Sequence, residues 1–85
     1  MTFDGAIIRE QGVTFGIAVV KSHVLNTTEV NESILTFQRI LGVAPVVLMA
    51  QDSRGVPTYY GRKDIVNFLA SIDMSRIPWK TYTYS

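Results

Sequence analysis

The stretch that most constrains the fold is residues 43–62, VAPVVLMAQDSRGVPTYYGR. Residues 46–50 are five consecutive apolar side chains, a pattern typical of a strand that is covered on both faces. Residues 52–55 then place an acceptor side chain first and a glycine last, which is the chemistry of a type I turn. Residues 56–60 return as a second strand, and Pro57 predicts that this strand lies at a sheet edge or at a bulge, because proline lacks a backbone donor. The sequence therefore predicts a β-hairpin that the rest of the chain must cover.

The length and composition of the chain predict one small domain with more apolar surface than it can cover. Its 85 residues are enough for a single hydrophobic core, and 47% of them are hydrophobic, which is high for a chain whose surface is large relative to its volume. We therefore expect residues 1–85 to form one α/β domain with some apolar surface left open. Such surface favours a protein partner or a second copy of the chain.

Charge and residue usage argue against several function classes. The formal net charge is +1, from eight basic and seven acidic residues, so no nucleic-acid partner is expected. The absence of cysteine excludes disulfides, thiolate nucleophiles and cysteine-type zinc sites. With one histidine and no acidic loop spacing, we expect no metal and no cofactor. No stretch reaches the roughly 18 apolar residues that span a bilayer, and no leader pattern is present, so we expect a cytoplasmic protein that contacts no membrane.

Three further segments have the pattern of strands. Residues 3–10 contain a short β-prone run, and residues 13–25 form the longest one. In the second segment the odd positions from Val13 to Val19 are large and apolar, while the even positions are small but still largely apolar. Residues 79–84 (WKTYTY) form an aromatic, β-prone tail, which we expect to pack on the body of the protein or on a neighbouring molecule.

Two segments have the spacing of amphipathic helices. Residues 27–41 carry an apolar stripe with intervals of four, three and four residues, and Asn26 with Glu29 forms a helix-start signal before it. Gly42 predicts the end of this helix because glycine accepts the left-handed conformation. Residues 63–72 repeat the helical spacing with one apolar face.

The order of strand, strand, helix, strand, strand and helix predicts a two-layer α/β sandwich. We expect a four- to five-stranded mixed sheet with two helices on one face, the tail being the possible fifth strand. The helix between residues 13–25 and 46–50 makes these two strands parallel. Because the strands are apolar on both sides, we expect a second copy of the chain to cover the other face.

Residues 27–72 resemble the C-terminal half of thioredoxin-like domains. They contain a helix, the pair Ala44-Pro45, two strands joined by a turn, a glycine and a closing helix with Phe68-Leu69. In that family a cis proline precedes the first of two antiparallel strands, so the resemblance implies a thioredoxin-like fold as an alternative architecture. Residues 22–25 (SHVL) stand where that family has its redox cysteines, so a relative of this kind could not perform disulfide exchange.

The most distinctive polar set lies between the hairpin and the second helix. A helix start there combines free backbone amides with two cationic side chains and nearby tyrosine hydroxyls, which together can hold an anion such as a phosphate. The carboxylate of Asp64 competes for the same amides, so a solvated helix start is the alternative interpretation. The candidate anion-binding residues are Tyr59, Tyr60, Gly61, Arg62 and Lys63.

Two smaller candidates lie elsewhere in the chain. The turn tip, Asp52, Ser53 and Arg54, projects short polar side chains from a rigid hairpin, although turn geometry alone accounts for these residue types. His23 could act as a base only with Asp52 or Ser53 within hydrogen-bond reach, and a histidine near a strand end is the simpler interpretation. We assign no catalytic residue from the sequence.

These observations favour an interaction module over an enzyme. The excess of apolar surface and the lack of a catalytic constellation lead us to expect a non-enzymatic module that acts as a homodimer, through its open sheet face or through the C-terminal aromatic tail. The expected partner is a second copy of the chain or another protein. The alternative is a small-molecule or anion-binding protein that uses the helix start at residues 59–63.

Overall fold

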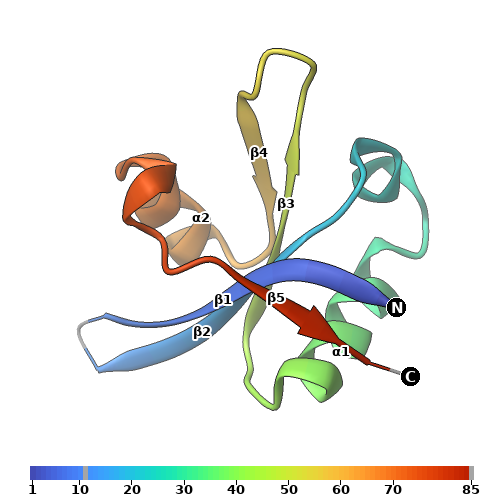
Figure 1. Ribbon diagram of the computed structural model, residues 1–85, viewed down its shortest axis with the longest axis horizontal. Helices are drawn as coiled ribbons and strands as arrows, with labels where there is room; N and C mark the ends of the chain where they lie inside the picture. Colours follow the sequence, from blue (N-terminus) through green and yellow to red (C-terminus); the bar gives the residue numbers. More distant parts are fainter. Residues whose placement is uncertain (11, 85) are drawn as a thin grey trace.

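The computed structural model describes residues 1–10 and 12–84 as one five-stranded mixed sheet with two α-helices (Figure 1). The strands follow the order β4-β3-β2-β1-β5 across the sheet. Strands β2 and β3 are parallel, and the other neighbours are antiparallel. The elements in chain order are β1 (Thr2–Glu10), β2 (Val13–Val19), the 3-10 helix η1 (Ser22–Asn26), α1 (Val30–Leu41), β3 (Val46–Gln51), β4 (Pro57–Tyr60), α2 (Lys63–Ala70), the 3-10 helix η2 (Met74–Arg76) and β5 (Lys80–Thr83).

The mixed sheet and the element order are confirmed, but the prediction of two helices on one face is wrong. Helix α1 covers the face that carries Ala18, Val46 and Leu48. Helix α2 covers the opposite face, where Ile17 and Val47 belong to the second core cluster. Figure 1 shows the two helices on different sides of the sheet.

The strand order explains why the helices lie on different faces. Strands β4 and β5 form the two outer edges, so the chain between them must cross the whole sheet. It crosses on the face that α1 leaves open, carrying α2, η2 and Trp79 over the apolar side chains there. The central strands are consequently buried on both faces by the chain itself. Within the described residues, the central strands therefore leave no open face of the kind expected from the sequence.

The first helix begins later than the capping pattern predicts. Residues 13–25 do not form one strand, because β2 ends at Val19 and the chain turns through η1. Asn26 belongs to η1, and Glu29 is the residue that precedes α1. In this turn Val24 and Leu25 pack against the core on the α1 face, which a straight strand would not allow. The end of the helix is as predicted, with Gly42 at a φ of 70°.

The β3–β4 hairpin closes as its sequence predicts. The Gly55 amide donates to the Asp52 carbonyl at 3.0 Å, and Gly55 adopts a φ of 82°. The Asp52 Oδ1 atom accepts from the amides of Arg54 and Val56 at 2.8 and 2.9 Å. The carboxylate thereby accepts hydrogen bonds from two turn amides in place of backbone carbonyls.

One element of the thioredoxin-like resemblance is present. The Ala44–Pro45 peptide bond is cis and precedes β3, the first strand of the antiparallel β3–β4 pair. On the other side of β3 the chain forms the antiparallel β1–β2 hairpin, with β2 parallel to β3. In the described part of the chain no helix is long and apolar enough to cross a membrane.

Candidate interaction surface

At the outer edge of the sheet, β5 has backbone amides and carbonyls that form no hydrogen bond with β1. The amide of Tyr84 donates to the Met1 carbonyl and the Met1 amine donates to the Tyr84 carbonyl, both at 2.9 Å. In an antiparallel pair such doubly bonded positions alternate with positions whose backbone groups point the other way. Tyr82 is paired with Phe3 in the same register, so its backbone amide and carbonyl point toward β1, as those of Tyr84 do. The amides and carbonyls of Thr81 and Thr83 therefore face outward, away from β1.

An aromatic cluster on the α1 face holds β5 against the body. The ring of Phe3 stacks on Tyr82 with centroids 5.3 Å apart, and it meets Phe37 of α1 edge-on at 4.8 Å. Tyr84 lies edge-on to the same ring at 5.7 Å. On the other face the Thr81 hydroxyl donates to Asp4 at 2.9 Å. The expectation that the tail packs back on the body is confirmed, and β5 is an ordered edge strand of the sheet.

The opposite edge, at β4, offers less to another strand. The Asp52 amide donates to the Val56 carbonyl at 3.0 Å, which fixes Val56, Thr58 and Tyr60 as the inward-pointing positions. The backbone groups of Pro57 and Tyr59 therefore point away from β3. Pro57 has no amide hydrogen, so this edge presents one outward donor where β5 presents two.

A shallow acidic groove begins where β5 ends. It has a volume of about 400 Å³, and Tyr84 forms part of its wall together with the first two turns of α1. Among the residues that the structure describes, ion pairs join Arg54 to Asp52 and Arg62 to Asp64 alone. The carboxylates of the groove therefore have no basic partner within the described chain. The groove is lined by Val20, Val24, Glu29, Glu32, Ser33, Thr36, Phe37 and Tyr84.

Lys80 is the basic residue of β5, and it lies on the same face as this groove. Its ammonium group is 5.9 Å from the centre of the Tyr82 ring. Lys80, Tyr82 and Tyr84 share one face because side chains alternate along a strand. Figure 1 shows this end of the chain beside α1. One edge thus combines free backbone groups, aromatic rings, a cation and an acidic groove.

The structure places the predicted anion-binding residues in different surroundings. Tyr59 packs with the core under α2, and Tyr60 follows it on the opposite face of β4. The guanidinium of Arg62 makes two hydrogen bonds to the carboxylate of Asp64, at 2.7 and 2.8 Å. These bonds hold the pKa of Asp64 below its usual range. Gly61 precedes this pair in the chain and Lys63 lies between its two members. Within the predicted set, Arg62 therefore already has an anionic partner.

The turn tip and His23 are also placed by the structure. Asp52 is engaged by the turn amides, and its second oxygen lies 4.0 Å from Arg54, while Ser53 is exposed at the tip. A hollow of about 240 Å³ lies between this turn and η1, where Asp52 and Ser22 share the lining. His23 follows Ser22 in η1 and is exposed, and its pairing with Asp52 or Ser53 stays a prediction.

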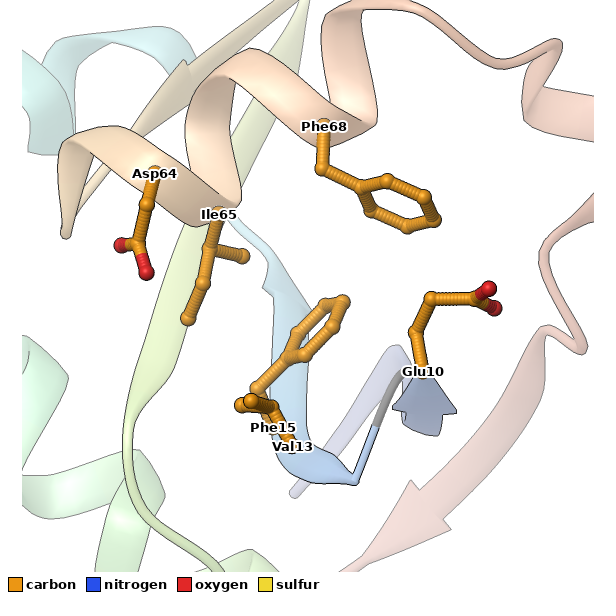
Figure 2. Close-up of a pocket in the computed structure, with 6 residues that line it drawn as sticks. All are labelled: Glu10, Val13, Phe15, Asp64, Ile65 and Phe68. Atoms are coloured by element: carbon orange, nitrogen blue, oxygen red, sulfur yellow. The ribbon is translucent and has the colours of Figure 1, made fainter.

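A second hollow, of about 210 Å³, separates the tip of the β1–β2 hairpin from α2 (Figure 2). Phe15 and Phe68 meet edge-on at its centre, with ring centroids 6.3 Å apart. The carboxylates of Glu10 and Asp64 lie on opposite sides of these rings and do not point toward each other. This arrangement does not place two carboxylates across one reacting group.

The burial of Tyr59 is a further feature that the sequence does not reveal. Its ring is half-buried, and its hydroxyl is inaccessible and has no hydrogen-bond partner among the described residues. Burial raises the pKa of this phenol. The hydroxyl is not required for the packing of the ring, because Tyr59 lies against an apolar cluster.

The residues of the β5 edge were not among the sequence-predicted site residues. The signal for them was present in the alternation of threonine with tyrosine at residues 81–84, which is typical of a strand with two different faces. The groove residues Glu29 and Glu32 gave no such signal, because they are 48 or more positions away in the chain. No protein-family model, curated protein or solved structure matches this chain.

Proposed function

We propose that this protein is a non-enzymatic interaction module that acts as a homodimer, with β5 of one copy pairing with β5 of another. One observation carries the proposal: β5 is an ordered edge strand whose Thr81 and Thr83 backbone groups point away from the sheet. Strand pairing satisfies such groups with backbone partners instead of water, and it extends the sheet from five strands to ten.

The location differs from the open sheet face that the sequence favoured. Both faces of the central strands are covered by helices of the same chain, which leaves the C-terminal tail as the other surface named at the outset. The tail supports pairing because the aromatic cluster fixes its backbone in advance. A strand that is ordered before association loses less conformational entropy when it pairs.

Light scattering coupled to size exclusion, at micromolar concentration, tests the proposal on the parent chain and on Thr83→Pro. The proline removes one outward amide without touching the bonds between β5 and β1, so we expect the parent to be a dimer and the variant to be a monomer. The loss of one donor from each copy, with the clash of the proline ring, predicts a dissociation constant at least about 100-fold higher.

A matched control comes from the part of β1 that lies beyond β5. Ile7 is two positions past Gly5, which is paired with Lys80, so its amide also points outward. Ile7→Pro therefore removes an outward donor that the proposed contact does not use, and its dimer should persist. A monomeric parent chain contradicts the proposal, and so does a dimer that Ile7→Pro disrupts while Thr83→Pro does not. Circular dichroism of both variants verifies that the fold is retained.

A further inference from the structure

We infer that the two copies meet in one register, with Tyr82 opposite Tyr82 and with Lys80 of each copy lying over Tyr84 and the acidic groove of the other. This inference rests on the proposed function, since it specifies the geometry of the same strand pair. It assigns a partner to the carboxylates of Glu29 and Glu32, and that partner is Lys80 of the second copy.

The outward backbone groups select the register. Two strands related by a two-fold axis form hydrogen bonds only where outward-pointing residues lie opposite each other. Opposing Thr81 of one copy with Thr83 of the other uses all the outward groups of β5. It gives two hydrogen bonds at each of two Thr81–Thr83 pairs and places Tyr82 on the axis.

The neighbouring registers use the edge less completely. A pair centred on Thr81 brings Trp79 opposite Thr83, and the Trp79 amide already donates to the Ile77 carbonyl at 2.8 Å. A pair centred on Thr83 joins this residue to itself and brings Thr81 opposite a position beyond the strand. The register centred on Tyr82 is the one in which β5 supplies every donor and acceptor.

The same register determines which side chains meet. Tyr82 faces Tyr82, and Lys80 stands directly opposite Tyr84 of the second copy, on the α1 face. Opposed Cβ atoms are about 5 Å apart, so the long side chain of Lys80 extends across the Tyr84 ring. Because Tyr84 forms one wall of the groove, the ammonium group arrives beside Glu29 and Glu32.

Charge complementarity favours a second copy as the occupant of this groove. In the described residues the groove carboxylates have no ion-pair partner, and neither has Lys80. Symmetry repeats the contact, so each dimer contains it twice. The two Lys80 side chains lie at opposite ends of the paired strands, about 14 Å apart along them, so they do not repel at close range.

Cysteine cross-linking measures the register, and the cysteine-free parent chain makes it specific. Tyr82→Cys places two thiols at a non-hydrogen-bonded pair with Cα atoms about 4.5 Å apart, within the range of a disulfide. In the same register, Thr81→Cys and Thr83→Cys each place their two thiols diagonally, with Cα atoms about 7–8 Å apart. We expect mild oxidation to link Tyr82→Cys and to leave the other two variants unlinked.

Charge reversal provides a second measurement that keeps the Tyr82 ring in place. Lys80→Glu and Glu32→Lys should each weaken the dimer about tenfold, and their combination in one chain should restore most of the loss. Lys63→Glu and Glu10→Lys are matched controls, since they make the same charge changes at residues that do not line the groove. Both controls should dimerise like the parent chain in sedimentation experiments.

The outcomes separate this inference from the proposed function. A dimer that links through Thr81→Cys or Thr83→Cys, and not through Tyr82→Cys, overturns the register while strand pairing at β5 stands. A dimer in which the reversals at Lys80 and Glu32 match their controls overturns the groove contact. A parent chain that is monomeric at micromolar concentration overturns the proposed function itself.

Discussion

The two outermost strands of the sheet are equally short but differ in what they present to another strand. Strand β4 has one outward amide, because Pro57 occupies the other outward position. Strand β5 has two outward amides, on Thr81 and Thr83. Neither position is a proline, and neither amide is hydrogen-bonded to β1. The comparison teaches that capacity for pairing depends on which residues alternate outward, and not on strand length.

The remaining open edge belongs to β1, beyond the point where β5 ends. The backbone amides and carbonyls of Ile7 and Arg9 point away from the sheet there. The chain from η2 to β5 runs close by, and Arg76 and Pro78 share a hollow with Ile8 and Glu10. Along β5, by contrast, Thr81 and Thr83 are exposed, and no hydrogen bond among the described residues uses their outer backbone groups.

Removing the aromatic ring that holds β5 should change the stability of this edge most, compared with the edge at β4. Phe3→Ala deletes the ring that contacts Phe37, Tyr82 and Tyr84, so we expect a loss of about 3 kcal/mol in the free energy of unfolding. Amide hydrogen exchange at residues 80–83 should accelerate more than exchange at β4. Phe15→Ala, on the other face, is the control. If Phe15→Ala accelerates amide exchange at residues 80–83 as strongly as Phe3→Ala does, the aromatic cluster is not what holds this strand.

Opening the blocked edge should give the next largest effect. Pro57→Thr would make residues 57 and 59 present outward groups as residues 81 and 83 do, so β4 could also pair with a copy of itself. Each restored hydrogen bond contributes about 1 kcal/mol to association. We expect light scattering to report a mass that rises with concentration past that of a dimer. A variant that stays at the parent mass would mean that proline is not the feature that blocks β4.

A smaller effect is expected from the buried hydroxyl of β4. Tyr59→Phe removes a buried hydroxyl that has no hydrogen-bond partner among the described residues, and it should raise the free energy of unfolding by about 1 kcal/mol. Because the pKa of Tyr59 is raised in the folded state, the parent chain should lose stability as pH rises above the ordinary tyrosine value of 10.0. Chemical denaturation from pH 8 to pH 11 should show a flatter alkaline limb for the variant. Tyr60→Phe is the control, because Tyr60 is exposed on the opposite face of β4, and an equal gain there would indicate a general effect of losing a hydroxyl.

The smallest effect is expected at the exposed pair that follows β4. Asp64 has a lowered pKa, so its pair with Arg62 contributes stability above the ordinary aspartate pKa and loses it as pH falls through the lowered value. Asp64→Asn should therefore flatten the acid limb of the unfolding curve slightly, because both side chains are exposed. In the same experiments, inorganic phosphate should not raise the melting temperature of the parent chain. Stabilisation that disappears in Arg62→Ala would support the anion site predicted from the sequence.

Local chemistry made several parts of the fold predictable from the sequence. The turn at residues 52–55 and the end of α1 at Gly42 depend on residues adjacent in the chain, and both are confirmed. The alternation in β2 also correctly predicts two apolar faces. The placement of the helices was not predictable in this way, because it depends on β5 lying at the edge opposite β4.

The candidate sites followed the same division. Strand alternation alone would have separated Tyr59 from Tyr60, and the spacing of Arg62 and Asp64 allowed their pairing to be anticipated. The candidate interaction surface could be found only in the tertiary structure, since it combines a strand at residues 80–83 with the start of α1. Asn26 failed as a helix cap because the packing of Val24 and Leu25 favoured a 3-10 turn over the local signal.

The hydrogen bonds between Met1 and Tyr84 have a practical consequence for experiments on this protein. They place the first and last described residues side by side, so an affinity tag or fusion partner at either end emerges next to β5. A bulky fusion there would shield β5 from another strand. A circular permutant, with residue 84 linked to residue 1 and the chain opened at the exposed 52–55 tip, would carry any tag to the far end of the β3–β4 hairpin.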